Sequence, residues 1–412
     1  MTKKPDAPAI RFKGFSDAWE QRKTIDIADY SKGNGYSKGD LTDAGTPIIL
    51  YGRLYTKYQF AISEVDTFAV PRNGAVYSQG NEVIVPASGE TAEDIARASA
   101  VEKSGVMLGG DLNILRPFDF ISPLFLALTI SNGEPQKELA KKAQGKSVVH
   151  IHNTDIQEVT IAYPSRTEQD RIVSVFRQLD NLITLHQRKF EKLTNVKKSM
   201  LEKMFPQNGC SYPEIRFKGF TDAWEQRKLE DYLTVSAEKN TGNIYGRSDV
   251  LSVSGDYGIV NQIEFQGRSF AGASVSNYGV VQTGDVVYTK SPLNSNPYGI
   301  IKTNKGKPGI VSTLYAVYHP KENAFSDFIQ VYFEQHARMN NYMHPLVNKG
   351  AKNDMKVSAE NALKGPVCFP SRIEQESISA FFSVLDNLIT LHQRELEKLQ
   401  NIKKSMLEKM FV

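Results

Sequence analysis

The sequence predicts an α/β (α+β) fold in which two similar mixed domains are joined by two long antiparallel coiled-coil helices. Three observations support this prediction: two sequence blocks occur twice, the regions between them are nearly equal in length, and the longer block has an apolar period of about 3.5 residues. IRFKGFSDAWEQRK, at residues 10–23, returns at 215–228 with 13 of 14 residues identical. The longer block, at 179–205, returns at 385–411 with 23 of 27 identical. Copies so far apart indicate a pseudo-two-fold tandem duplication of domain-sized units.

The repeated blocks divide the 412-residue chain into segments. Each half contains a short block, a variable domain and a long helix, and a linker joins the two halves. The variable stretches between blocks, 24–163 and 229–369, have 140 and 141 residues but share little sequence. The predicted segments, in order, are 1–23, 24–164, 165–205, 206–228, 229–370 and 371–412.

The variable domains nevertheless share landmarks of secondary structure. NEVIVPA at 81–87 falls opposite GDVVYTK at 284–290, and both patterns are typical of strands. SPLFLAL at 122–128 falls opposite SDFIQVYF at 326–333, and both begin with Ser and continue as an apolar helix. We therefore expect one scaffold used twice with different surface residues.

Each long helix has a start signal and a heptad pattern. In PSRTEQ at 164–169, Ser165 is the expected N-cap and Glu168 its capping-box partner; PSRIEQ repeats the signal at 370–375. The apolar spacing that follows alternates between four and three residues, which favours a left-handed coiled coil over a pair of amphipathic helices buried in a globular core. Its two histidines are interpreted as register-setting polar positions rather than metal ligands. The predicted seam consists of Phe176, Leu179, Ile183, His186, Phe190, Leu193, Phe382, Leu385, Ile389, His392, Leu396 and Leu399.

Composition is that of a globular protein, with 40% hydrophobic and 23% charged residues. The two cysteines, Cys210 and Cys368, are far apart, which indicates free thiols in a reducing compartment, and we expect a cytoplasmic protein. The first residues lack the apolar core of a signal peptide. The apolar run at 121–130 is too short to cross a membrane, so no membrane association is expected.

No catalytic or metal site is predicted. GKS at 145–147 lacks the upstream glycine of a P-loop, because Ala140 occupies that position. NSNPYG at 294–299 is similar to the Asn-Pro-Pro-Tyr motif of adenine methyltransferases, but one proline and the methyl-donor motif are missing. His150 and His152 alternate as residues on one strand face do, without a cysteine or acidic partner for a metal.

The tandem layout, the RFKGFxDAWEQRK blocks and the PSRxEQ helix starts resemble the specificity subunits of type I restriction–modification enzymes, over essentially the whole chain. The resemblance implies two target-recognition domains, a non-catalytic chain, and assembly with two adenine-methylating subunits and, for restriction, motor-nuclease subunits. It implies no cofactor on this chain, with S-adenosylmethionine, ATP and Mg on the partner subunits. The expected substrate is double-stranded DNA with two unlike half-sites, and helices of roughly 58 Å would set the spacer.

Residues suited to DNA contact are Lys, Arg, Asn and Gln in loops, although any single one is as easily a solvated side chain. The first variable domain has a net charge of −5 and the second +1, so a binding face must be local. We expect the loops at 144–147 and 349–353 to be the better candidates. The predicted DNA-binding residues are Lys32, Asn34, Tyr36, Lys38, Arg53, Arg72, Asn73, Lys142, Gln144, Lys146, Lys290, Ser291, Asn294, Lys349, Lys352 and Asn353.

Two other functions are consistent with parts of the pattern. A coiled-coil scaffold without a DNA role would show no sequence-specific DNA binding in complex with its methylating partner. A self-sufficient enzyme would methylate or cleave DNA alone, which the missing motifs oppose.

Overall fold

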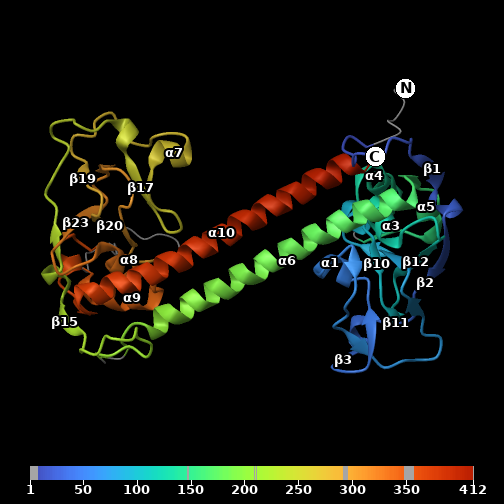
Figure 1. The fold of residues 1–412 in the computed structure, drawn as a ribbon, viewed down its shortest axis with the longest axis horizontal. Helices are drawn as coiled ribbons and strands as arrows, with labels where there is room; N and C mark the ends of the chain where they lie inside the picture. Colours follow the sequence, from blue (N-terminus) through green and yellow to red (C-terminus); the bar gives the residue numbers. More distant parts are fainter. Residues whose placement is uncertain are drawn as a thin grey trace. The chain divides into compact units, whose positions relative to one another are not determined.

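The computed structural model describes residues 8–145, 148–207, 209, 211–290, 296–347 and 357–411. Its contacts divide the chain into two compact units (Figure 1). Unit 1 comprises Met1–Gln187 and Arg394–Val412, and unit 2 comprises Arg188–Gln393. Each unit therefore contains a variable domain, the first part of one long helix and the last part of the other.

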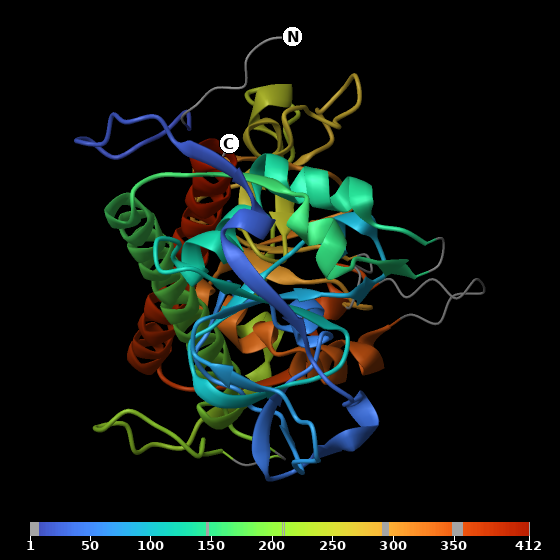
Figure 2. The ribbon, with the colours of Figure 1, turned by 90° about the vertical axis from the view of Figure 1, so that its right-hand side faces the viewer.

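The core of unit 1 is a five-stranded sheet covered by helices. Its central strand β8 is buried at every position, as expected for a strand covered on both faces. Helices α3 (Pro123–Ile130) and α4 (Gly133–Lys142) pack against each other, and α3 contacts the sheet (Figures 1 and 2). The strand order is β2 (Ala28–Lys32), β12 (Leu112–Pro117), β8 (Glu82–Pro86), β10 (Ser99–Val101) and β5 (Ala61–Ile62).

A second sheet forms an outer lobe of unit 1. It has its own small core, and its strands are short. The strand order is β3 (Leu41–Thr42), β6 (Phe68–Ala69), β4 (Thr46–Ile49), β11 (Ser104–Leu108) and β7 (Tyr77–Gln79). The remaining elements are β1 (Glu20–Lys23) with β14 (Thr160–Tyr163), β9 (Ser88–Gly89) with β13 (Val149–His150), and the helices α1 (Arg53–Thr56), α2 (Ala92–Ile95) and α5 (Asn153–Gln157).

Unit 2 repeats the inner sheet of unit 1. Its four strands have the same order as the first four strands in the sheet of unit 1. In each unit, two helices follow the sheet strand that comes last in the sequence. The strand order is β16 (Leu233–Val235), β23 (Ala316–Pro320), β20 (Val286–Tyr288) and β21 (Ile301–Thr303). The two helices, α8 (Ser326–Glu334) and α9 (His336–Met343), come after β23 in the sequence. The expectation of one scaffold used twice is thus confirmed.

The outer lobe of unit 2 differs from that of unit 1. Two separate antiparallel pairs replace the five-stranded sheet. These are β17 (Leu251–Ser254) with β18 (Gly258–Asn261), and β19 (Gly279–Val281) with β22 (Gly309–Val311). The helix α7 (Gln262–Gln266) follows β18. Elsewhere in the unit, β15 (Glu225–Lys228) pairs with β24 (Pro366–Phe369). The variable domains therefore diverge in their outer lobes and agree in their inner sheets.

The long helices α6 (Arg166–Lys203) and α10 (Arg372–Met410) run antiparallel within each unit. In unit 1, Phe176 of α6 contacts Phe411, and Asp180, one turn further along α6, pairs with Lys403. In unit 2 the roles are exchanged: the Phe382 ring lies 6.1 Å from that of Phe205, and Lys197 Nζ lies 2.6 Å from Asp386 Oδ1. Residue numbers rise on one helix as they fall on the other, which confirms the predicted antiparallel pairing.

All twelve predicted seam residues are buried or half-buried, and burial is greatest toward the variable domains. Other leucines of the long helices are exposed. Leu182 and Leu185 of α6 are 43% and 45% exposed, and their counterparts Leu388 and Leu391 of α10 are also exposed. Each helix therefore has an apolar face that the other helix does not cover.

Each unit has an aromatic cluster in its core, and one ring of that cluster comes from the other half of the chain. In unit 2, Phe205 is fully buried, and its ring lies 5.9 Å from that of Trp224 and 5.8 Å from that of Phe328. In unit 1, Phe411 lies 5.9 Å from Phe125. Offset and edge-to-face arrangements at these separations add to the gain from burying the rings. The clusters are Trp19, Phe125, Phe176 and Phe411 in unit 1, and Trp224, Phe328, Phe382 and Phe205 in unit 2.

The short blocks fasten the helices to one another. Arg11 donates two 2.7 Å hydrogen bonds to Glu168, which is almost completely buried, and Arg216 donates equally to Glu374. Glu168, which the sequence suggested as a capping-box partner, is thus bound by the short block. Ile10 also donates its N–H to the carbonyl oxygen of Lys409, near the end of the opposite helix. Buried bidentate pairs of this kind fix geometry.

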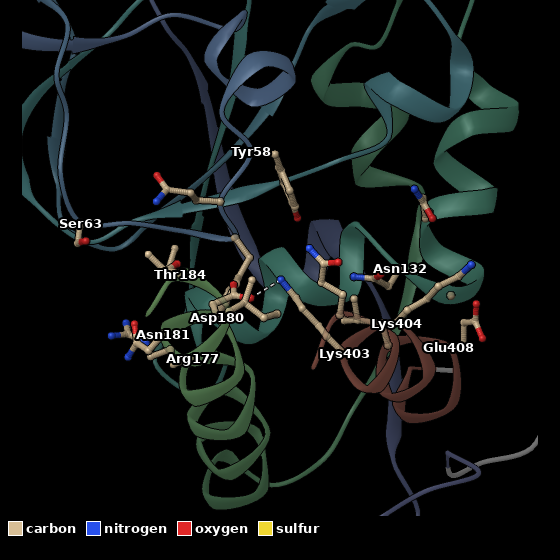
Figure 3. Close-up of a pocket in the computed structure, with 18 of the residues that line it drawn as sticks. Tyr58, Ser63, Asn132, Arg177, Asp180, Asn181, Thr184, Lys403, Lys404 and Glu408 are labelled. Carbon is tan, nitrogen blue, oxygen red and sulfur yellow. Dashed lines mark hydrogen bonds and ion pairs between the residues drawn. The ribbon is translucent and has the colours of Figure 1, made fainter. Parts of the chain in front are cut away.

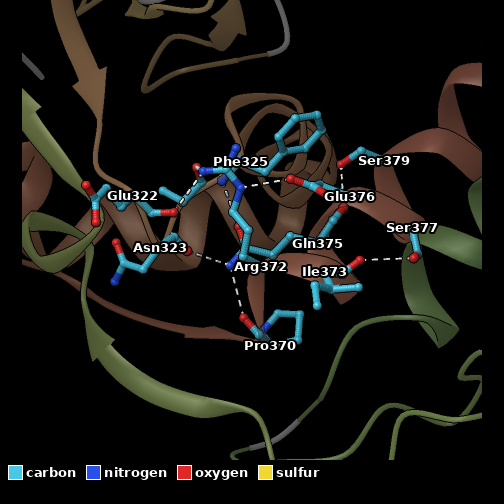
Figure 4. A network of polar contacts seen from close by, with 11 residues as sticks. Glu322, Asn323, Phe325, Pro370, Arg372, Ile373, Gln375, Glu376, Ser377 and Ser379 are labelled. Atoms are coloured by element: carbon cyan, nitrogen blue, oxygen red, sulfur yellow. Dashed lines mark hydrogen bonds and ion pairs between the residues drawn. The ribbon is translucent and has the colours of Figure 1, made fainter.

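The PSRxEQ sequence binds the preceding loop of the variable domain (Figure 4). Arg372 donates to the carbonyl oxygens of Glu322 and Ala324 at 2.8 and 2.7 Å. The Gln375 amide donates to Asn323 and accepts the N–H of Phe325 at 2.9 Å. Unit 1 repeats these contacts through Arg166 and Gln169. The repeated sequences therefore join each variable domain to the helices. Among the residues placed by the structure, no helix combines the length and apolar character needed to span a membrane.

Candidate nucleic-acid interface

The loop between β2 and β3 is held against the outer lobe of unit 1 by Tyr36. The hydroxyl of Tyr36 accepts the Arg72 N–H at 2.8 Å, and the Arg72 guanidinium lies 5.1 Å from the centre of the Tyr36 ring. Arg72 also pairs with Asp40. The backbone N–H of Ser37 and the Arg72 guanidinium lower the pKa of Asp40 to about 2. The predicted residues Tyr36 and Arg72 therefore belong to one small network.

The predicted residues on this loop face a common region. Asn34 donates to the carbonyl oxygen of Gly74 at 2.7 Å, next to the exposed Asn73. Lys32, exposed at the end of β2, begins the same loop. Lys38 and Arg53 line a hollow of about 910 Å³. Six residues predicted from separate stretches of sequence thus meet at the outer lobe; they are Asn34, Tyr36, Lys38, Arg53, Arg72 and Asn73.

The cations of this hollow differ in how they are held. Arg53 is 9% exposed, and its guanidinium donates to Asp66 at 2.6 Å and to the carbonyl oxygen of Glu64 at 2.9 Å. Lys57 donates to the same carboxylate at 2.6 Å, and the bonds from Lys57 and Arg53 lower the pKa of Asp66. Lys38 is exposed and has no side-chain hydrogen bond or ion pair with the described part of the chain. Arg53 is therefore a structural cation, while Lys38 is available for a ligand.

A second predicted group lies at the end of α4. Lys142 is half-buried in the last turn, and Gln144 exchanges backbone hydrogen bonds with His150. Lys146 lies outside the described residues. This group does not contribute to the hollow beside Lys38.

In unit 2, Lys290 lies two residues after β20, and its backbone φ of 34° is unusual for a residue other than glycine. Its ammonium donates to the carbonyl oxygen of Thr313 at 2.9 Å. Burial and the neighbouring Lys239 lower the pKa of Lys290. The other predicted residues of this domain lie outside the described residues; these are Ser291, Asn294, Lys349, Lys352 and Asn353.

A further hollow in unit 1, of about 950 Å³, lies where the domain meets the helices (Figure 3). Most of its cations are paired: Lys403 with Asp180, Arg177 with Glu102, and Lys137 with Glu134. The remaining Lys404 is accompanied in the lining by Glu408 of opposite charge. Lys403 also lies 6.0 Å from the Phe60 ring centre. This hollow holds helix and domain together and has little positive charge left for an anion.

The histidines considered as ligands have structural partners. His150 Nδ1 lies 3.2 Å from Ser88 Oγ, and His152 lies beside Asp155. Within the described ranges, no group of three or more His, Cys, Asp or Glu residues is placed to hold a metal ion. The polar networks described above hold neighbouring segments of the chain in place.

Comparison with known proteins identifies a domain and two relatives of this chain. Residues 16–195 match the family described as the type I restriction modification DNA specificity domain. Two proteins of Methanocaldococcus jannaschii are similar over most of their length. One, provisionally named the type I restriction enzyme MjaX specificity subunit, is 24% identical over 73% of this chain and 70% of its own; the MjaVIII specificity subunit is 21% identical over 81% and 79%.

The chain is thus similar to type I specificity subunits, and its residues 16–195 match their DNA specificity domain. A solved specificity (S) subunit of a type I system from M. genitalium shares the fold, with a TM-score of 0.60 and 13% identity over 98% of this chain and 99% of that one. The resemblance inferred from the repeated blocks is thus confirmed. Both relatives are named as specificity subunits.

Two residues of the hollow were missed from the sequence. Tyr51, which is 38% exposed, and Lys57 line it beside Lys38. The run YGRLYTK at 51–57 places aromatic and basic residues together, a composition found at nucleic-acid surfaces. That run was a usable signal, but only Arg53 was taken from it.

Proposed function

We propose that this specificity subunit reads a bipartite, asymmetric site on double-stranded DNA through its two variable domains. The observation that supports this most directly comes from comparing the sheets of the two units. Their inner sheets share one strand order, while their outer lobes are built differently. Two unlike readers on one scaffold are suited to two unlike half-sites. Sequence would be read by side chains of the outer lobes at base edges.

The subunit acts by positioning. We propose that it docks two adenine-methylating subunits, which carry S-adenosylmethionine, and motor-nuclease subunits that use ATP and Mg. Duplicated surfaces support two copies of one partner. The exposed leucines recur as Leu182 with Leu185 and Leu388 with Leu391. Shallow hollows also recur on each helix, one beside Arg188 and one beside Arg394. We place the complex in the cytoplasm.

Stoichiometry tests the docking part of this proposal. The chain should bind two methylating subunits by native mass spectrometry. Replacing Leu388 and Leu391 with Glu should remove one copy, because two charges would lie in an apolar contact. The control is Ile373→Glu, which adds one such charge at a residue of α10 that is 69% exposed and outside the repeated leucines. Loss of both copies, or of neither, would argue against two equivalent surfaces.

Methylome sequencing tests the reading part. A host that expresses this chain with its methylating subunit should carry methylated adenines in one motif with two defined halves and an undefined spacer. A scaffold without a DNA role would leave the host methylation pattern unchanged, and a self-sufficient enzyme would modify DNA without the partner.

A further inference from the structure

A nine-residue sequence recurs in the two otherwise dissimilar variable domains. GNGYSKGDL at 33–41 matches GNIYGRSDV at 242–250, with Gly, Asn, Tyr and Asp at the same four positions. The sixth position is basic in both, as Lys38 and Arg247. These two segments are called the GNxY element below. Because they lie 209 residues apart, they fall out of step with the repeated blocks, which are 205 or 206 apart.

Both copies of the GNxY element form the same turn. In each, a one-turn 3-10 helix starts at the basic residue and ends at the aspartate. Asp40 Oδ2 accepts the N–H of Ser37 at 2.8 Å, and Asp249 Oδ2 accepts the N–H of Gly246 at 2.8 Å. Each aspartate also donates its own N–H to the carbonyl oxygen three residues before it, at 3.1 Å. The hydrogen bonds of the aspartates thus account for the shape of the turn.

The basic residue is not needed for that shape. Lys38 is exposed and makes no side-chain bond within the described chain, although it lines the hollow beside Tyr51. Arg247 is also exposed, and among the described residues its guanidinium donates only through Nη2, to the carbonyl oxygen of Ala271 at 2.9 Å. Other N–H groups of the guanidinium are left for a ligand. A cation held at one place on the same turn, in two domains whose sequences share little else, is suited to bind a feature that all DNA sequences share.

We propose that the GNxY element contacts a DNA phosphate in each variable domain, with Lys38 and Arg247 as the cations. The inference rests on the proposed DNA-reading function and assigns it a sequence-independent contact. Phosphate contacts fix register without reading bases, so readers of different sequences can share them. Tyr36 and Asp40 are positioning residues, since they hold the turn through Arg72 and Ser37.

The test measures salt dependence in the complex of the full chain with its methylating subunits. Binding to a labelled duplex of arbitrary sequence and to one containing the methylated motif is measured from low to moderate KCl. Each of Lys38→Gln and Arg247→Gln should reduce the slope of log K against log salt by about one on both duplexes, and the double variant by about two. The methylated motif should not change. Lys38→Arg should restore the slope.

Matched controls remove the same charge elsewhere in each domain. Lys103 and Lys364 are exposed and lie outside the GNxY element, so Lys103→Gln and Lys364→Gln should leave the slope unchanged. An unchanged slope in both element variants, or an altered recognition motif, would overturn the inference. Failure of the wild-type complex to prefer its methylated motif over the arbitrary duplex would instead overturn the proposed function, because the slope is measured on both.

Discussion

Replacing Phe205 with Ala tests how the two halves of the chain complete each other. Phe205 is followed by the linker between the halves, yet its fully buried ring lies in the core of unit 2, against Trp224, Phe328, Tyr332 and Phe382 at 5.8 to 6.1 Å. Replacing a buried Phe with Ala costs about 3–5 kcal/mol, because the transfer free energy of the removed atoms is lost and the cavity that they leave adds a further cost. With a urea dependence of about 2 kcal/mol per molar, the unfolding midpoint of unit 2 should fall by roughly 2 M.

The two tryptophans of the chain provide the assay, because each unit contains one. Trp19→Phe leaves Trp224 as the reporter of unit 2, and Trp224→Phe leaves Trp19 as the reporter of unit 1. Phe205→Ala should shift the transition reported by Trp224 far more than that reported by Trp19. The matched variant Phe411→Ala should do the reverse. An equal or larger shift at Trp19 for Phe205→Ala would refute the exchange of helix ends between halves.

Four further predictions concern the paired helices. Asp180→Lys should destabilise unit 1, and adding Lys403→Asp should recover part of the loss in a double-mutant cycle of urea midpoints; an additive double variant would deny the pair a role. Burial lowers the pKa of Lys197, but Glu334 and Asp386 outweigh it and raise that pKa, so its contribution to stability should be present below pH 10.5 and be lost above it. Thermal melts of wild type and Lys197→Met should therefore converge at high pH, and a constant difference would contradict this. A chain ending at Gln207 should dimerise in sedimentation, because residues 188–205 differ from 394–411 at only four positions; a folded monomer would oppose this. Inserting matched heptads after Asn195 and its counterpart should change the spacer in the methylome motif, and an unchanged spacer would oppose a role for helix length.

The duplication and the long helices were predictable because their signals are local and repeated. The PSRxEQ starts and the heptad spacing lie within one stretch each, and α6 and α10 begin at the arginine of that sequence. The exchange of helix ends is a consequence of antiparallel pairing. No local pattern specifies which residues at the helix ends enter the cores. Phe205 lies in the core of unit 2 and Phe411 in the core of unit 1, and both depend on how the helices pack against the domains.

The sheets were less predictable. β5 has two residues, and its partner β10 lies about 40 positions later, so the pairing depends on packing rather than on sequence period. Side-chain partners were also uncertain from sequence. Glu168 was expected to cap its own helix, but Arg11, from the other end of the domain, reaches it.

The candidate interface was predictable in composition and only partly in place. The Tyr36 loop and Arg72 meet because β3 and β6 pair, a contact outside any sequence window. Arg53 has the residue type expected for DNA contact, but the carboxylate of Asp66 engages it. Arg247 was missed because comparison at the spacing of the repeated blocks places its counterpart a few residues away from Lys38.

Exchange of one variable domain tests the central claim most directly. Residues 24–163 would be replaced with the corresponding region of another specificity subunit, leaving the short blocks and helices intact. Methylome sequencing of a host that expresses the chimaera with the same methylating subunit should show one half of the motif replaced and the other half unchanged. A change in both halves, or an unchanged motif in a folded and active chimaera, would contradict two independent readers on one scaffold.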